Sequence, residues 1–147
     1  MRLELELICP TALGRQAGAY AVVSDADDRV LLVRAGNGRF YLPGGRIEPF
    51  ETPEEALRRE ILEECGWSAR ITRRLGAAAQ PILGGAVLLD ASYWRAELVD
   101  LLHEEPEHLM LWTPRSEAAS RLHRAGDAKA ILGGMVPRDG LGKTFHK

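Results

Sequence analysis

The sequence predicts one α/β layered domain in which mixed strands surround a single long helix, and three observations support this fold class. The chain has 147 residues, the length of one ordinary domain. Hydrophobic residues make up 46% and charged residues 27%, as in globular chains and unlike disordered ones. Strand-like runs precede and follow one strongly delimited helix. We therefore expect residues 1–147 to form a single domain, with a loosely held tail over 137–147.

Composition and charge exclude several classes of protein. Lys and Arg number 19 against 21 Asp and Glu, a net charge of −2, whereas a domain that binds bulk nucleic acid is usually basic. No apolar run approaches about 18 residues, and the first residues lack the pattern of a signal peptide, so no membrane association is expected. The two cysteines, Cys9 and Cys65, imply no disulfide framework. These features predict a cytoplasmic protein.

The segment before the helix is predicted to contain short strands. Alternating or continuous apolar runs indicate strands at Leu3–Leu7, Ala17–Ser24, Val30–Val33 and Phe40–Leu42. Turn-forming residues at Asp25–Asp28 separate the second and third runs, so we expect these two strands to form a hairpin. Pro43-Gly44-Gly45 is expected to end the fourth strand.

The long helix is delimited by local capping signals. Thr52 is suited to the N-cap position, Pro53 to the first helical position, and Glu55 completes a capping box with Thr52. Gly66 is placed to end the helix in a left-handed conformation. These signals predict a helix over Pro53–Cys65.

Further strands and two short helices are expected after Gly66. The predicted strands are Ala69–Ala79, Ala86–Val99 and Leu109–Trp112, with an acidic loop at Leu102–Pro106. A helix is expected to start at Thr113-Pro114 and to reach about His123, and another to span Asp127–Leu132.

One side of the long helix is predicted to be densely acidic. At about 100° per residue, Glu60, Glu63 and Glu64 fall within an arc of about 100°. The adjacent arc is apolar and suited to packing on a sheet; it carries Leu57, Ile61 and Cys65. A solvated surface is the simplest explanation for such carboxylates, but an oxygen-only cluster also suits a hard cation such as Mg²⁺ or Mn²⁺.

The spacing over Gly45–Trp67 favours the metal site, because the segment resembles the Nudix box of the MutT-like Nudix hydrolases. Every specified position of that box is matched, by Gly45, Glu51, Arg59, Glu60, Ile61, Glu63, Glu64, Gly66 and Trp67. Leu42-Pro43-Gly44 before it is also similar to the family. Phe50 stands where many members have glycine, and Trp67 is bulkier than the usual aliphatic residue.

The resemblance implies the Nudix fold, an α/β/α sandwich with a mixed β-sheet, and a metal-dependent pyrophosphohydrolase. It implies Mg²⁺ or Mn²⁺ as the cofactor. The implied metal ligands are the carboxylates of Glu60, Glu63 and Glu64 and the carbonyl of Gly45. Glu51 and Arg59 would form an ion pair that holds the loop on the helix.

The resemblance also implies a general base that removes a proton from the attacking water. Family members often use the residue at the position of Glu60, or a glutamate in a later loop. Glu107 in the segment before Trp112 is our preferred loop base, with Glu104 and Glu105 as alternatives.

The implied substrate is a small nucleoside diphosphate linked to another moiety. The short chain favours a nucleoside triphosphate or an oxidised nucleotide; ADP-ribose or a nucleotide sugar is the alternative, and a non-catalytic nucleotide sensor is an alternative of another class. Arg46, Phe50 and Arg39 are the predicted substrate contacts. Six aromatic residues could stack on a nucleobase, although most are predicted to lie in the core: Tyr20, Phe40, Tyr41, Tyr93, Trp94 and Trp112. The sequence is compatible with both a monomer and a homodimer.

Overall fold

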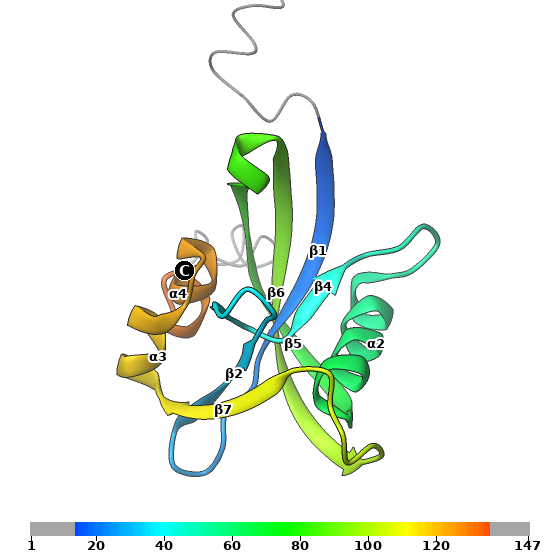
Figure 1. Ribbon diagram of the computed structural model, residues 1–147, viewed down its shortest axis with the longest axis vertical. Helices are drawn as coiled ribbons and strands as arrows, with labels where there is room; N and C mark the ends of the chain where they lie inside the picture. The colour runs from blue at the N-terminus through cyan, green and yellow to red at the C-terminus, as the bar shows by residue number, and fades with distance from the viewer. Residues whose placement is uncertain (1–13, 136–147) are drawn as a thin grey trace, which may run out of the picture.

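A computed structural model describes residues 14–135 of the chain (Figure 1). The strand expected at Leu3–Leu7 and the loose tail expected from Pro137 lie outside the described residues. The elements in chain order are β1 (Arg15–Val22), β2 (Arg29–Arg34), β3 (Phe40–Tyr41), β4 (Gly44–Arg46), α2 (Pro53–Cys65), β5 (Trp67–Ile82), the 3₁₀ turn η2 (Leu83–Gly85), β6 (Val87–Leu101), β7 (Leu109–Pro114), α3 (Arg115–Arg121) and α4 (Ala125–Ile131). Within this part of the chain, no helix is long and apolar enough to cross a membrane.

The strands form two sheets at the centre of the domain. The larger sheet has the order β4-β1-β6-β5 and is mixed, because β1 runs parallel to β6 and antiparallel to β4. The smaller sheet has the order β3-β2-β7 and is antiparallel. Helix α2 lies on one side of the sheets, and α3 and α4 lie on the other (Figure 1). The α/β/α sandwich predicted from the sequence is therefore confirmed.

Alternate residues of β1 face the two sides of the sandwich. Ala19 and Ala21 pack with Leu57 and Ile61 of α2, whereas Tyr20 and Val22 pack on the side of α3 and α4. A strand buried on both faces is apolar throughout rather than alternating, which explains the continuous run in the sequence.

Helix α2 has the bounds that its capping signals predict. The Thr52 hydroxyl accepts a hydrogen bond from the Glu55 backbone N–H at 3.1 Å, and the Glu55 carboxylate accepts one from the Thr52 N–H at 2.9 Å. Gly66 ends the helix with φ of 81°, a left-handed conformation that glycine adopts without strain. The whole cap depends on contacts within a few residues, which is why the sequence predicts it.

One prediction about the first strands is wrong, and one strand was missed. β1 and β2 do not form an extended hairpin: beyond a bridge between Ser24 and Val30 they separate into different sheets. The strand β3 ends before Pro43-Gly44-Gly45 as expected, but Gly44 also begins β4, which pairs with β1. Gly44 has φ of 143°, and a Cβ there would overlap the backbone of β1. This close approach requires glycine, so the residue that resembled a strand terminator is a strand residue.

Candidate active site

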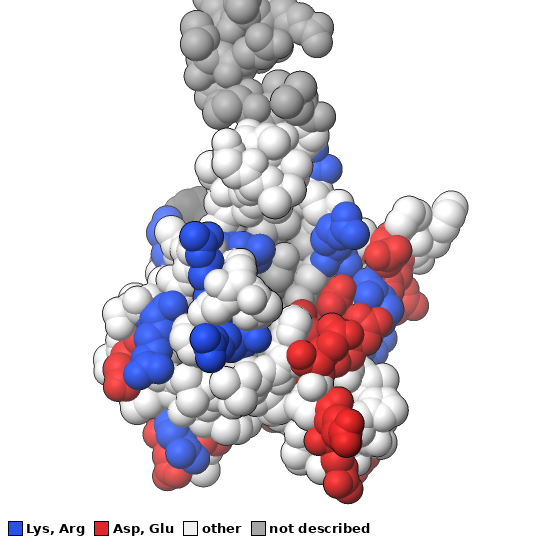
Figure 2. All heavy atoms as spheres, viewed as in Figure 1, with Lys and Arg blue, Asp and Glu red and all other residues white. Residues whose placement is uncertain are grey.

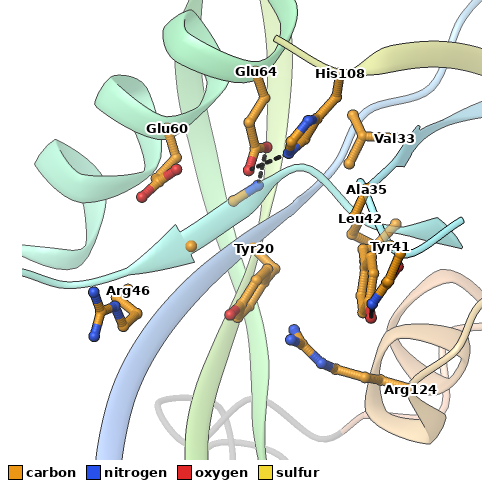
Figure 3. A pocket seen from close by; sticks show the side chains of 13 residues that line it. Tyr20, Val33, Ala35, Tyr41, Leu42, Arg46, Glu60, Glu64, His108 and Arg124 are labelled. Carbon is orange, nitrogen blue, oxygen red and sulfur yellow. Dashed lines mark hydrogen bonds and ion pairs between the residues drawn. The ribbon is translucent and has the colours of Figure 1, made fainter. Parts of the chain in front are cut away.

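The three carboxylates predicted on α2 have different environments. Glu63 is exposed, Glu60 is half-buried, and Glu64 is only 8% exposed. Glu64 points towards the start of β4, where one of its oxygens accepts a hydrogen bond from the Gly44 N–H at 3.0 Å (Figure 3). The acidic side of α2 is thus partly buried against the glycine strand rather than fully solvated.

Gly45 provides the space in which the Glu60 carboxylate lies. A Cβ added to Gly45 would be 2.5 Å from the Glu60 carboxyl carbon, closer than two such atoms can approach. The helix and β4 therefore meet with carboxylate oxygens directly beside the glycine backbone. This arrangement brings together two of the predicted ligand residues, Glu60 and Gly45.

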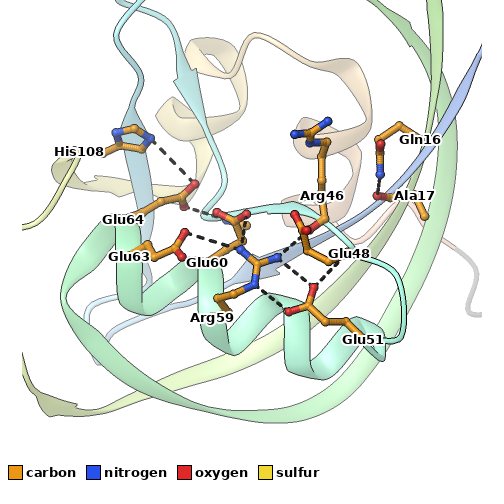
Figure 4. A network of polar contacts seen from close by, with 11 residues as sticks. Gln16, Ala17, Arg46, Glu48, Glu51, Arg59, Glu60, Glu63, Glu64 and His108 are labelled. Atoms are coloured by element: carbon orange, nitrogen blue, oxygen red, sulfur yellow. Dashed lines mark hydrogen bonds and ion pairs between the residues drawn. The ribbon is translucent and has the colours of Figure 1, made fainter.

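Glu51 and Arg59 form a bidentate ion pair between the loop after β4 and α2 (Figure 4). Arg59 Nε donates to one Glu51 oxygen at 2.7 Å and Nη2 donates to the other at 2.9 Å. Arg59 also donates to the Arg46 carbonyl at 3.1 Å and to the Glu60 carboxylate at 3.1 Å. The pair lowers the pKa of Glu51 to about 2, so this carboxylate stays charged and holds the loop on the helix.

A cavity of about 390 Å³ lies beside these carboxylates. Glu60 and Glu64 line one end, together with Gly44, Gly45 and Arg46. The rest of the lining is Tyr20, Val33, Ala35, Asn37, Tyr41, Leu42, His108 and Arg124. A concave site of this size, with polar groups among aromatic and aliphatic ones, is typical of small-molecule binding.

The loop before β7 approaches the acidic end of the cavity. The Glu107 N–H donates to the Glu63 carbonyl at 3.3 Å, and the negative charge of Glu107 helps to raise the pKa of both Glu60 and Glu64. Glu104 and Glu105 are exposed and are not among the charges that act on these two groups. His108, which no motif singles out in the sequence, lines the cavity with Nε2 3.9 Å from the Glu64 carboxylate.

Two of the three predicted substrate contacts lie outside this cavity. Arg46 lines it, but Arg39 lines a neighbouring cavity of about 510 Å³, where its Nη1 is 3.0 Å from His123 Nε2. Phe50 is fully exposed in the loop between β4 and α2, and this loop projects from the domain (Figure 1). Of the aromatic residues, Tyr20 and Tyr41 line the cavity, whereas Tyr93 is buried in the core.

We expect Phe50→Gly to stabilise the protein. Phe50 has φ of 71°, a left-handed conformation that costs a residue with a Cβ about 1–2 kcal/mol. Its side chain is fully exposed, so no packing is lost on replacement. Urea denaturation should show an increase of up to about 1 kcal/mol in the free energy of unfolding. Glycine relieves the backbone strain, but it also loses more backbone entropy on folding, which offsets part of the gain. A loss of stability would contradict this expectation, because it would mean that the Phe50 side chain makes stabilising contacts in solution.

Arg124 and Asp127 are functional candidates that the sequence analysis missed. Arg124 lies between α3 and α4 and lines the cavity, and Asp127 is 0% exposed behind it. The Asp127 carboxylate accepts hydrogen bonds from the Tyr93 hydroxyl at 2.7 Å and from the Leu42 N–H at 3.3 Å. No motif marks these residues, because their partners are far away in the sequence.

The donor set at the acidic end suits a hard divalent cation. Within residues 14–135, no three His, Cys, Asp or Glu side chains converge with the geometry of a metal-binding site. Burial, and to a smaller extent the neighbouring carboxylates, raises the pKa of both Glu60 and Glu64, so these groups are poorly solvated and close to one another. Arg59, the cation that contacts Glu60, is also paired with Glu51. Carboxylate oxygens are the ligands that Mg²⁺ and Mn²⁺ prefer.

Stability of the metal-free protein is expected to fall as the pH rises from about 5 to about 8. Burial raises the pKa of Glu64 from its ordinary 4.5 to about 8 in the folded state. A group with a raised folded-state pKa stabilises the fold fully below its unfolded pKa and loses that contribution as the pH passes the folded value. Urea denaturation in chelator should show the decline, and Glu64→Gln should remove most of it. Glu51 affects stability in a separate, more acidic pH range. Its pKa is lowered to about 2 in the folded state, so its contribution is lost only as the pH falls below its ordinary pKa of 4.5.

The sequence is similar to those of known proteins. A sequence model of the NUDIX domain matches residues 14–132. A Bacillus subtilis (strain 168) protein provisionally named as an 8-oxo-dGTP diphosphatase is 40% identical over 65 residues, 44% of each chain. The nucleoside triphosphatase NudI of Escherichia coli O1:K1 / APEC is 44% identical over 66 residues, 45% of this chain and 43% of the relative. The chain thus spans less than half the length of these curated relatives.

Solved structures share the fold at low sequence identity. A NUDIX hydrolase from Nitrosomonas europaea superposes with a TM-score of 0.72 at 20% identity, over 86% of this chain and 95% of that one. The MutT protein of Methanosarcina mazei Go1 superposes with a TM-score of 0.68 at 21% identity, over 81% and 91% of the two chains. These similarities show the architecture of the domain.

Proposed function

Because the chain belongs to the NUDIX domain family, we propose that it is a metal-dependent pyrophosphohydrolase that cleaves a nucleoside diphosphate linked to another moiety. One observation carries the proposal: the carboxylates of Glu60 and Glu64 line the end of the cavity beside Gly45. An acidic wall repels a pyrophosphate unless a cation lies between them. A nucleotide-binding cavity of this kind therefore suits metal-assisted attack of water on phosphorus.

Nudix hydrolases generally need a divalent metal, and Mg²⁺ or Mn²⁺ is the proposed ion here. Glu60, Glu63, Glu64 and the Gly45 carbonyl would hold it. When bound, the ion would neutralise the pyrophosphate and lower the pKa of the attacking water. Arg59 keeps Glu60 beside Gly45, because its guanidinium binds Glu60, Glu51 and the Arg46 carbonyl at once.

Glu107 is the proposed general base. The support is that its backbone N–H donates to the Glu63 carbonyl, which holds this exposed residue near the carboxylates of α2, and that its charge acts on Glu60 and Glu64. Glu60 is the alternative base, but it is engaged by Arg59. Arg46 is the proposed contact to substrate phosphate in the cavity, while Arg39 and Phe50 would contact only the parts of a substrate that extend beyond it.

A nucleoside triphosphate or an oxidised nucleotide is the proposed substrate. The support is the printed names of two relatives, a nucleoside triphosphatase and an 8-oxo-dGTP diphosphatase. Free nucleotides of this kind are cytoplasmic, so we place the activity there. A relative from Mus musculus, 36% identical over 73 residues, is named a diphosphoinositol polyphosphate phosphohydrolase, so a non-nucleotide pyrophosphate is also worth assaying.

The test is release of phosphate and pyrophosphate from a panel of substrates, each with Mg²⁺, with Mn²⁺ and with chelator. The panel holds nucleoside triphosphates, oxidised purine nucleotides, ADP-ribose, nucleotide sugars and a diphosphoinositol polyphosphate. Metal-dependent cleavage of one class would support the proposal, and the products would identify the bond that is cut. Folded, metal-bound protein that cleaves nothing would contradict it and would favour a nucleotide sensor.

A further inference from the structure

Arg124 lies across the cavity from the carboxylates of α2. It is half-buried and lines the cavity beside Tyr20 and Tyr41, at the opposite side from Glu60 and Glu64 (Figure 3). Its guanidinium lies over the ring of Tyr41, 4.7 Å from the centroid, and over that of Tyr20 at 5.3 Å. The two rings hold the cation by cation–π contact, so its guanidinium stays inside the cavity.

No carboxylate in the described part of the chain forms an ion pair with Arg124. The nearest acid along the chain, Asp127, directs its oxygens to Tyr93 and to the Leu42 N–H instead. The negative charge of Asp127 acts on the guanidinium, and the Tyr20 hydroxyl is its one described side-chain hydrogen-bond partner. One hydroxyl cannot use all five N–H donors of a guanidinium, so Arg124 keeps donors for a further ligand. The cavity therefore contains a cation with capacity to bind an anion.

The position of Arg124 is set by buried hydrogen bonds at the start of α4. The Gln80 side chain accepts from the Gly126 N–H at 3.0 Å, and it donates to the Tyr93 hydroxyl at 3.1 Å. The Tyr93 hydroxyl in turn donates to Asp127. These contacts tie α4 to β5 and β6, so the guanidinium is held in place before any ligand arrives.

Basic side chains continue beyond Arg124. Arg124, Tyr41 and Asn37 also line the neighbouring cavity, which contains Arg39 and His123. Within residues 14–135, Arg39 makes no ion pair either; its Nη1 contacts only the His123 ring. Figure 2 shows acidic side chains gathered over α2 and the loop before β7, and basic ones on the side of α3. One end of the site thus suits a cation and the other an anion.

We propose that Arg124 binds a phosphate group of the substrate that the metal does not coordinate. This proposal rests on the proposed function. The planar guanidinium can donate two parallel hydrogen bonds to phosphate oxygens. Such a phosphate could be the terminal one of a nucleoside triphosphate or a phosphomonoester on the sugar; both present the same dianionic group. A neutral purine edge is less suited, because it would leave the charge of Arg124 uncompensated.

The first experiment measures binding without metal and without turnover. The chain is titrated with inorganic phosphate in excess chelator and followed by NMR. Arg124→Gln should weaken binding about tenfold or more, since a charge-assisted bidentate contact is lost. Arg124→Lys should keep part of the affinity, and Arg121→Gln, at an exposed position on α3, should leave it unchanged. Equal affinity in the parent and Arg124→Gln proteins would overturn the proposal, whether or not the protein is an enzyme.

The second experiment separates the two sources of the phosphate. Kd values are measured, with chelator present, for the parent and Arg124→Gln proteins with two matched pairs. One pair is GTP and GDP; the other is coenzyme A and its form lacking the 3′-phosphate. A loss of at least about tenfold confined to GTP supports a terminal phosphate, and one confined to coenzyme A supports a phosphomonoester. An equal loss across all four ligands, or no loss for any of them, would contradict the proposal.

Discussion

Glu64→Gln is expected to reduce turnover of the proposed substrate by at least about 100-fold while the fold is retained. The amide oxygen can still accept the hydrogen bond from the Gly44 N–H, so the contact between α2 and β4 survives. The substitution removes only the negative charge at the acidic end of the cavity. Removing a residue that only orients a metal ligand typically lowers metal affinity or activity 10- to 100-fold. Removing the charge of a ligand itself is expected to lower them at least as much.

Steady-state kinetics with Mg²⁺ and calorimetric titration of the metal would measure this effect. Glu54→Gln is the matched control, since Glu54 lies on the same helix but does not line the cavity. In chelator near neutral pH, Glu64→Gln should be no less stable than the parent, because burial raises the pKa of Glu64 to about 8 and already disfavours its charge. Turnover and metal affinity close to those of the parent would refute the assignment of Glu64.

Asp127→Ala is expected to destabilise the protein by about 3 kcal/mol. It would leave the Tyr93 hydroxyl and the Leu42 N–H without their acceptor inside the core, at about 1–3 kcal/mol for each buried unsatisfied group. The carboxylate is 0% exposed, so its removal also opens a void. The measurement is urea denaturation at constant pH.

Two further variants sharpen the test of Asp127. Asp127→Asn keeps an oxygen acceptor and most of the volume, so it should cost less than Asp127→Ala. Asp100→Ala at an exposed position on β6 should change stability by no more than about 0.5 kcal/mol. A loss below about 1 kcal/mol for Asp127→Ala would mean that water replaces the carboxylate and that the network does not anchor α4.

The parts of the site that the sequence predicts depend on local contacts. Helix α2 follows from residues that cap it within one turn, and its acidic side follows from helical spacing. The ion pair between Glu51 and Arg59 joins residues only eight positions apart. The order of strands and helices likewise predicts an α/β/α sandwich, although not which strands pair.

What the sequence analysis predicted wrongly or missed concerns contacts between distant segments. Asp25–Asp28 form the turn that the sequence indicates, yet β1 and β2 separate because β1 pairs with β6, some 70 residues away. Gly44 resembles a strand terminator in isolation, but it lies in β4 because only glycine fits against β1. His108 resembles a solvated loop residue until the loop folds back on Glu64.

By itself, then, the sequence determined the helix, its row of carboxylates and the family of the chain, because these depend on spacing and on nearest neighbours. Only the tertiary structure decided that Glu64 is buried against Gly44 and that Arg124 lies across the cavity from it. Both results require strands and helices from distant segments to pack together, since burial and long-range charge are properties of the assembled layers. Neither property is encoded in any single window of residues.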